Sequence, residues 1–216
     1  WAPVSQKLEP ATKGYLNLHS DSHLESLHKV VEGIHRHGAK VSVQLTAGRG
    51  RVIRVKWQDP TVAPVSASAT SCYFSPERKA RAITTQEAEE LAQAFGAAAM
   101  RCKMAGADAI EIHGHEGYLS DQFMTGLWNQ RTDKYGGSRE KRLTLARESI
   151  EAIRGEVGTD FPIIYRIALD HYLEGGRKPE ESLWILQQLE AAGIDAFHVD
   201  AGCYETMWWP HPPTYQ

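Results

Sequence analysis

The sequence predicts an α/β protein with a (β/α)8 TIM barrel, here only an interior section with about four of the eight strands. Three segments share one pattern, in which a helix ends at a glycine, the chain turns, and a β-branched strand follows; they are 37–46, 105–114 and 192–202. Residues 158–168 form a fourth unit of the same shape. Helices that alternate with strands indicate a parallel sheet. No strand leads into a G-x-G-x-x-G turn, which favours a barrel over a doubly wound sheet.

The first two helices are located by their apolar spacing and their end signals. Residues 23–37 carry an apolar stripe, and we expect Asp21 and Ser22 to cap its start. The helix at 85–105 opens with the capping box TTQE, which begins at Thr84.

The next two helices are predicted in the same way. Residues 139–154 place apolar side chains at helical spacing, with Ser138 as the expected cap. The helix at 179–192 begins with Pro179, at a position where the missing N–H costs nothing.

Composition limits the classes of protein to which the chain belongs. With 216 residues and 42% hydrophobic content it can bury a core, and its net charge of −3 gives no reason to expect nucleic acid or a membrane surface as a partner. Three scattered cysteines without a C-x-x-C pair fit a reducing compartment, so we expect a cytoplasmic protein. The apolar runs are too short for a transmembrane helix.

The two ends of the chain suggest that it is part of a longer protein. It opens at Trp1 in a predicted loop and closes in WWPHPPTYQ, which is hostile to strand formation. A complete barrel typically takes about 250 residues. We therefore expect residues 1–216 to form one partial domain, without the first two and the last two strands of the barrel.

The predicted connections are uneven in length, and this places the site. Turns from helix to strand are short, whereas the loops after the first two clear strands are long, at roughly 47–83 and 115–137. Ligands of parallel α/β folds bind at the carboxyl ends of the strands, where such loops gather. The candidate site therefore lies at the ends of VQLT, EIHG, YRIA and HVDAG.

Two polar residues lie on these strands. Gln44 offers an amide donor and acceptor to the edge of a heterocycle, unless it is a satisfied interior glutamine. Arg166 cannot shed its charge, so it needs an anion nearby. That anion is either Glu111, on an inward face of an earlier strand, or a ligand whose ring system becomes anionic during turnover.

The segment HGHEGY raises a choice between a metal site and an organic ligand. His113 and His115 have the spacing of a metal-ligand pair at a strand end, and His198 and Asp200 could complete such a site. That spacing shares one face only if the strand continues through the intervening glycine, so we predict no metal and expect His115 to be exposed in the loop. Glu116 follows directly.

Tyr118 is the candidate acid of the same segment. It follows Gly117, which lets the backbone turn and aim the phenol over the strand ends. A phenol with a pKa near ~10 can donate a proton to a carbanion-like carbon. The alternative is a tyrosine that only packs.

The segment EIHGHEGYLSDQFMTGLWNQRTDKYGGSREKRL (111–143) resembles the signature of the Old Yellow Enzyme family of FMN-dependent NADH:flavin oxidoreductases. VQLTAGR, RAITTQE, YRIALDHYLEGGR and DAGCYE are similar to further blocks of the family, in the same order. Within the family, the chain looks closest to the branch of 2,4-dienoyl-CoA reductases, 2-enoate reductases and trimethylamine dehydrogenase relatives. The resemblance covers nearly the whole chain and implies an FMN-binding TIM barrel.

The resemblance assigns roles to individual residues. Gln44 matches the glutamine that binds the flavin pyrimidine edge, and Arg166 matches the arginine beside flavin N1 and O2. His113 matches the first of two positions that bind the substrate anion, and Tyr118 matches the tyrosine that protonates substrate Cα after hydride arrives at Cβ. The second substrate-binding position, histidine or asparagine in many members, is Glu116 here.

The resemblance implies an ene-reductase that reduces enoate, enone or dienoyl-CoA substrates with hydride from NADH or NADPH. Glu116 leaves open the alternative of a flavin-dependent amine dehydrogenase. The H-x-H pair leaves open the alternative of a barrel metallohydrolase. The parent protein would carry a 4Fe-4S cluster and FAD if it follows the larger members, and the FMN phosphate would bind outside this chain. The expected partners are a small unsaturated substrate, the remainder of the barrel and, as an open alternative, a second copy; the isolated section is expected to be inactive.

Overall fold

The computed structural model describes residues 1–9, 16–54 and 63–208, and its centre is a parallel sheet. Five strands follow one another across this sheet in the order β1 (Ala2–Pro3), β2 (Ser42–Thr46), β6 (Ala109–Gly114), β7 (Ile163–Ala168) and β8 (Ala196–Asp200). The four strands predicted from the sequence are confirmed, and the sheet does not close into a barrel within the described residues. The predicted interior section of a TIM barrel is therefore correct.

Strand β1 was not predicted, because the start of the chain was expected to be a loop. Its two residues, Ala2 and Pro3, pair with Leu45 and Thr46 of β2. Proline is tolerated at such an edge position because it has no N–H to donate to a further strand. The predicted end of the chain, residues 209–216, lies outside the described residues.

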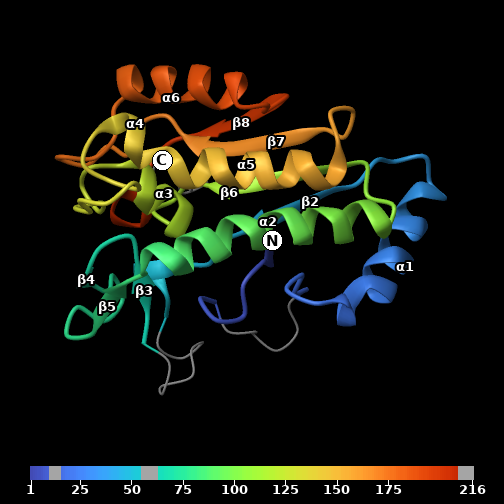
Figure 1. Ribbon diagram of the computed structural model, residues 1–216, viewed down its shortest axis with the longest axis horizontal. Coiled ribbons are helices and arrows are strands. Elements are labelled where there is room, and N and C mark those ends of the chain that lie inside the picture. The colour runs from blue at the N-terminus through green and yellow to red at the C-terminus, as the bar shows by residue number, and fades with distance from the viewer. Residues whose placement is uncertain (10–15, 55–62, 209–216) are drawn as a thin grey trace.

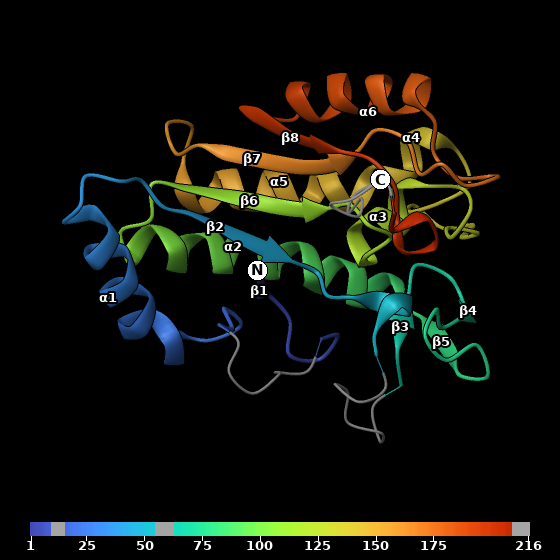
Figure 2. The same cartoon turned by 180° about the vertical axis from the view of Figure 1, so that it is seen from behind.

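Helices cover one face of the sheet. The helices α1 (Leu24–His35), α2 (Thr85–Met104), α5 (Thr144–Val157) and α6 (Pro179–Ala191) alternate with the strands along the chain. Helices α2 and α5 lie against the sheet in Figure 1, whereas Figure 2 shows its other face without a helix over it in the described part of the chain. A barrel interior corresponds to this uncovered face.

Close packing of α2 against α5 explains a glycine in the middle of a helix. A Cβ atom built on Gly96 of α2 would lie 2.7 Å from the backbone oxygen of Ala152 in α5. Phe95 and Ile150, next to this contact, are fully buried. The two helices therefore approach through the missing side chain of Gly96.

Glycines end the helices as predicted. Gly38, Gly106 and Gly193 all have positive φ angles, of 76°, 88° and 112°, directly before the turns into β2, β6 and β8. Gly158 has the same conformation (φ 80°) at the end of α5. Residues with a Cβ rarely adopt this region, so glycine makes each short turn possible.

The predicted capping box and the predicted N-terminal proline are confirmed. Thr84 Oγ1 accepts from Glu87 N (3.0 Å), while Glu87 Oε2 accepts from Thr84 N (2.9 Å). Pro179 occupies the first turn of α6. The expected caps Asp21 and Ser22 are wrong, because both lie inside a 3₁₀ turn and neither side chain caps α1.

The helix predicted at 139–154 is broken. Ser138 caps a short helix, α4 (Arg139–Arg142), by accepting from Lys141 N at 3.3 Å. Leu143 then takes φ −88° and ψ −3° before α5 begins. Its side chain is fully buried, so the chain bends to place this leucine in the core.

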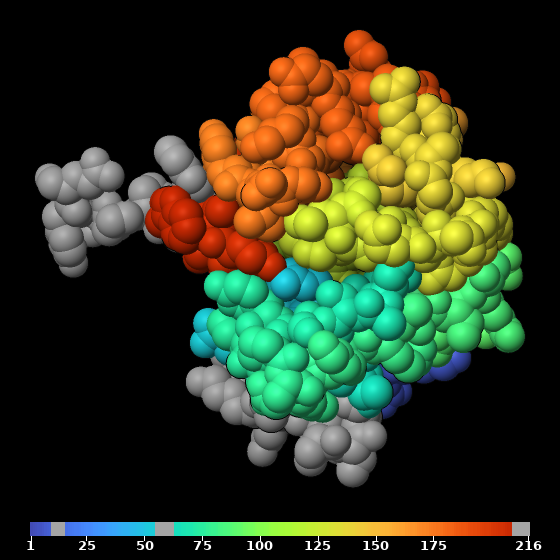
Figure 3. Space-filling model, turned by 90° about the vertical axis from the view of Figure 1, so that its left-hand side faces the viewer, coloured from blue at the N-terminus to red at the C-terminus, as the bar shows by residue number. Residues whose placement is uncertain are grey.

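The long loops gather at the carboxyl ends of the strands, as predicted. The loop after β2 contains a small sheet of β3 (Val65–Ser66), β5 (Lys79–Ala82) and β4 (Thr70–Ser71), and the loop after β6 contains α3 (Leu119–Met124). Figure 3 views this end: the loops after β2 (teal), β6 (yellow-green), β7 (orange) and β8 (red) meet on one face. No helix among the described residues is long and apolar enough to cross a membrane.

Candidate functional site

Strand alternation sends the candidate side chains to the uncovered face of the sheet. Ile110 and Ile112 of β6 are buried in the core on the helix side, so Glu111 and His113 point the opposite way. The parallel register then sets His113 beside Arg166, its partner on β7.

A chain of hydrogen bonds crosses this face. Gln44 Nε2 lies 2.5 Å from Glu111 Oε1, and Glu111 Oε2 lies 2.9 Å from His198 Nδ1. Strands β2, β6 and β8 are thus joined by their side chains as well as by the sheet. The imidazole of His198 is half exposed at the edge of this row.

Arg166 has a partner that the sequence analysis did not select. Its guanidinium contacts Asp200 Oδ2 through Nη2 (3.0 Å) and Nε (3.2 Å), so of the two alternatives the pairing with Glu111 is wrong. Asp200 ends the adjacent strand β8, where the register brings the two side chains within reach. The Arg166 side chain is 26% exposed.

The predicted exposure of His115 is also wrong, because this side chain is only 1% exposed. Strand β6 continues through Gly114, and the His115 ring then packs 4.3 Å from the ring of His113. Its Nδ1 lies 2.6 Å from Asp200 Oδ2, in an ion-pair contact whose angle falls outside hydrogen-bond geometry.

His113 is buried and neutral. Burial, together with the charges of His115 and Arg166, holds its pKa well below the usual value. Its Nδ1 is buried and has no hydrogen-bond partner among the residues that the structure describes. A neutral imidazole with an unused nitrogen can hydrogen-bond to a ligand.

Three potential metal ligands lie close together, but they are not the set of three histidines that the alternative metallohydrolase would use. Ligand atoms of His113, His115 and Glu116 lie within 4.8 Å of one another. His198, the third histidine of that alternative, instead pairs with Glu111. Glu116 adopts a left-handed backbone (φ 57°), which turns its carboxylate toward the two imidazoles.

Tyr118 lies over the strand ends, as the turn at Gly117 (φ 73°) predicts. Its ring is nearly parallel to that of His113, with centroids 4.5 Å apart and an interplanar angle of 20°. Burial is the largest cause that raises its pKa, and the neighbouring Tyr204 and Glu116 raise it further. Tyr118 therefore stays protonated at neutral pH.

A buried ionic cluster behind the site was missed by the sequence analysis. Asp121 accepts from Arg177 Nη1 (2.8 Å), from the Gly117 backbone N–H (2.8 Å) and contacts His171 Nε2 (3.1 Å). The three side chains are fully buried. Burial opposes the charge of Asp121, but Arg177 and His171 outweigh it, and the pKa of Asp121 falls well below its usual range. The cluster fixes the turn that carries Tyr118.

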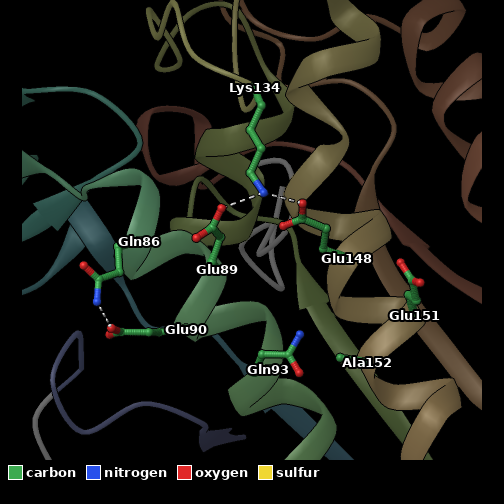
Figure 4. A pocket seen from close by; sticks show the side chains of 8 residues that line it. All are labelled: Gln86, Glu89, Glu90, Gln93, Lys134, Glu148, Glu151 and Ala152. Atoms are coloured by element: carbon green, nitrogen blue, oxygen red, sulfur yellow. Dashed lines mark hydrogen bonds and ion pairs between the residues drawn. The ribbon is translucent and has the colours of Figure 1, made fainter.

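A separate cavity lies away from the strand ends. It has a volume of about 790 Å³ on the outer surface between α2 and α5, and none of its lining residues belongs to the strand ends. Figure 4 shows Lys134 reaching into it between Glu89 and Glu148, with 2.8 Å to each carboxylate. These contacts join the two helices on the solvent side.

The side chains at the strand ends fit a flavin. Gln44 supplies an amide and Arg166 supplies a fixed positive charge. The buried Nδ1 of His113 has no hydrogen-bond partner among the described residues. A planar ring with hydrogen-bonding edges that gains negative charge on reduction matches this set.

Comparisons with known proteins agree with this fit. The model of the NADH:flavin oxidoreductase / NADH oxidase family matches residues 4–212. Cinnamate reductase from Clostridium sporogenes is 39% identical over 87% of this chain and 30% of its own length. The structure of a 2-naphthoyl-CoA reductase complex is 29% identical, with a TM-score of 0.82 over 95% of this chain and 32% of its own.

Histamine dehydrogenase from Rhizobium sp. 4-9 is also similar, with 28% identity and a TM-score of 0.79 over 94% of this chain and 30% of its own. The chain thus spans about a third of the length of these proteins. The expected resemblance to the Old Yellow Enzyme family is confirmed. This chain belongs to the NADH:flavin oxidoreductase / NADH oxidase family.

Proposed function

We propose that the protein containing this chain is an FMN-dependent reductase of activated C=C bonds, which takes hydride from NADH or NADPH. The observation that carries the proposal is the position of a protonated, buried phenol, Tyr118, against the neutral imidazole of His113 at the strand ends. The names of two similar proteins, a cinnamate reductase and a 2-naphthoyl-CoA reductase, support this choice of substrate class.

In this proposal two residues hold the cofactor. The Gln44 amide would hydrogen-bond to the pyrimidine edge of the flavin, and the Arg166 guanidinium would compensate the negative charge that the ring gains on reduction. The flavin, when bound, supplies the hydride that reaches substrate Cβ. Asp200 keeps the guanidinium in place through two N–H contacts.

The substrate side is formed by His113, Glu116 and Tyr118. His113 donates a hydrogen bond to the carbonyl or carboxylate oxygen conjugated with the C=C bond, which favours the negative charge that develops there. Tyr118 donates its proton to substrate Cα. Glu116 provides a carboxylate next to the imidazoles, so it disfavours an unpaired anion at its own position.

An acceptor panel tests the proposal. The full-length protein, loaded with FMN, is given NADH or NADPH and cinnamate, 2-cyclohexenone or crotonyl-CoA in turn, under anaerobic conditions. Histamine is given separately, without NADH or NADPH, to the protein with oxidised FMN, which then serves as the electron acceptor. Reduction of at least one unsaturated compound supports the proposal. A protein that binds no flavin after reconstitution, or that reduces none of the three, contradicts it.

An amine dehydrogenase is the second candidate, and Glu116 is the observation that favours it. A carboxylate beside the reacting carbon attracts a cationic amine rather than an enolate oxygen. The similarity to histamine dehydrogenase is compatible with this alternative. Oxidation of histamine without reduction of any unsaturated compound would select it.

The remaining parts of the protein enter as further proposals. We infer that missing strands pair with the edges β1 and β8 and close the barrel, and that the FMN phosphate binds on them. A 4Fe-4S cluster and FAD would belong to segments beyond this chain, because its own three cysteines are free and buried in separate places. The isolated 216-residue chain would lack activity, because it lacks the strands that we propose close the barrel and bind the FMN phosphate.

A further inference from the structure

A second tyrosine contacts the proposed proton donor. The hydroxyl of Tyr204, in the loop after β8, lies 3.0 Å from the hydroxyl of Tyr118. The two rings are nearly parallel, with centroids 5.7 Å apart and an interplanar angle of 17°. This is the hydrogen bond that the structure gives the Tyr118 hydroxyl within the described part of the chain.

The loop that carries Tyr204 is fixed to the site. Cys203 pairs with Glu116 in a parallel β-bridge, and its N–H donates to Thr206 Oγ1 at 3.0 Å. The Thr206 hydroxyl in turn donates to the His171 carbonyl at 2.7 Å. The contact between the two hydroxyls is therefore held by three strand-end loops rather than by one flexible side chain.

Tyr118 must be reprotonated after it has donated its proton, and the contact with Tyr204 provides a route. Tyr118 is only 6% exposed, and each proton that it gives to a substrate must be replaced before the next turnover. Burial raises the pKa of its phenol, so a phenolate left there is unfavourable and draws a proton from a donor within reach. The other titratable groups beside it are His113, a neutral imidazole stacked on its ring, Glu116, a carboxylate, and Arg49, whose guanidinium does not give up its proton.

Tyr204 is suited to supply that proton. It is half-buried and packs on the rings of Tyr73 (5.7 Å) and Phe74 (5.4 Å), and Phe74 is 36% exposed. It thus connects the buried phenol with the surface of the molecule. Both groups are phenols joined by a hydrogen bond, so a proton can pass directly from one oxygen to the other.

We propose that Tyr204 is a proton relay that reprotonates Tyr118 after each turnover. Tyr118 O–H breaks as its proton forms the new C–H bond at substrate Cα. Tyr204 O–H then breaks as its proton passes to the Tyr118 oxygen, and Tyr204 recovers a proton from water. No electron changes hands in these steps, and the only co-reactant is water.

The relay rests on the proposed function and is tested in the full-length flavin-loaded protein. The enzyme is reduced with one equivalent of NADH or NADPH, mixed in a stopped-flow instrument with the unsaturated compound that the acceptor panel selects, and followed by flavin absorbance and by tyrosinate absorbance. For Tyr204→Phe we expect the first reoxidation of the flavin within about twofold of the wild type, because Tyr118 starts protonated. The tyrosinate signal should persist about tenfold longer or more, because its donor is gone.

Two variants serve as controls. Tyr118→Phe removes the tyrosinate signal and slows the first reoxidation, which identifies the signal. Tyr73→Phe keeps the ring that packs on Tyr204 and should leave both measurements unchanged. A purely structural role for Tyr204 would slow the first reoxidation as well.

The outcomes separate the relay from the function on which it rests. If the wild type reduces an unsaturated compound but tyrosinate decays equally fast in Tyr204→Phe, the relay is wrong and the proposed function stands. Slowing of the first reoxidation by the same factor as tyrosinate decay also overturns the relay. If the wild type reduces none of the unsaturated compounds, the proposed function fails and the relay fails with it.

Discussion

His115 and Arg166 share one carboxylate. The Nδ1 atom of His115 lies 2.6 Å from Asp200 Oδ2, and the Arg166 guanidinium contacts the same oxygen at 3.0 and 3.2 Å. The positive charge of Arg166, which we propose acts on the flavin ring, is thus partly neutralised by Asp200 on the next strand. Asp200 therefore sets how much of that charge a ligand on the uncovered face experiences.

Removal of the Asp200 charge should raise the midpoint potential of bound FMN. In Asp200→Asn the Arg166 charge is no longer compensated, so the reduced, anionic ring is favoured; about 1.4 kcal/mol corresponds to roughly 30 mV for two electrons. Spectroelectrochemical titration of the full-length protein measures the shift. Asp160→Asn, an exposed carboxylate far from the strand ends, is the matched control. An unchanged or lower potential in Asp200→Asn would contradict the role given to Arg166.

Loss of the Tyr118 hydroxyl should slow one half-reaction only. Tyr118→Phe removes the proton donor, so reduction of the unsaturated substrate should fall by about 10²–10⁴-fold, while flavin reduction by NADH or NADPH stays nearly constant. Rapid mixing of each half-reaction separates the two rates. Tyr172→Phe, whose ring is 45% exposed, serves as the control. Equal slowing of both half-reactions would remove Tyr118 from the donor role.

The buried cluster around Asp121 should be important for stability. Asp121→Asn leaves the fully buried guanidinium of Arg177 without its counter-charge, which costs about 3–5 kcal/mol. Asp21→Asn removes a carboxylate that pairs with Arg101 at 2.7 Å but is 75% exposed, and should cost about 1 kcal/mol or less. Urea unfolding of the full-length variants compares the two. Similar losses would show that the cluster does not carry the stability assigned to it.

His113 should make the protein less stable in acid. Because burial keeps its folded-state pKa below the unfolded value of about 6.5, the unfolded chain binds a proton that the folded chain does not. Its stabilising contribution is complete above that pH and is lost as the pH falls below it, by up to about 1.4 kcal/mol per pH unit. Unfolding titrations at several pH values should show a shallower acid slope in His113→Gln, but not in His37→Gln, an exposed histidine. An equal slope in the two variants would assign the acid sensitivity to other groups.

Two helical glycines should respond in opposite directions to the same substitution. Gly96→Ala forces a Cβ to within 2.7 Å of the Ala152 carbonyl oxygen, so α2 and α5 must separate, at a cost of about 1–3 kcal/mol. Gly155→Ala meets nothing within 4 Å and should stabilise the protein by about 0.5–1 kcal/mol. Thermal unfolding of both variants tests the pair. A stabilised Gly96→Ala variant would show that the helices are not in close contact there.

Much of the fold is predictable because its signals are local. Apolar spacing, the capping box at Thr84 and the glycines before each strand depend on neighbouring residues, and all of them appear in the structure. The errors arise where contacts between distant parts of the chain decide the local structure. Leu143 breaks a helix in order to fill the core, and the two-residue strand β1 exists only because β2 lies beside it.

The site was predictable in position but not in its contacts. Parallel strands end at one edge, so Gln44, His113 and Arg166 could be placed there from the sequence. The partner of Arg166 depends on the register with a strand whose Asp200 lies 34 residues further along the chain, and the buried His115 contacts the same Asp200. Tyr204 and Asp121 were missed because a tyrosine in a loop and an aspartate in a helix carry no signal of their own. The positive φ angle of Glu116 likewise cannot be predicted from its residue type.

The row formed by Gln44, Glu111 and His198 has a consequence for synthesis of the protein. A barrel emerges from the ribosome strand by strand, and its lining faces water until the last strand arrives. A lining of leucine side chains would expose apolar surface during synthesis and favour aggregation. Here amide, carboxylate and imidazole groups bind one another across the uncovered face, so this face of the sheet is hydrophilic while the chain is being synthesised.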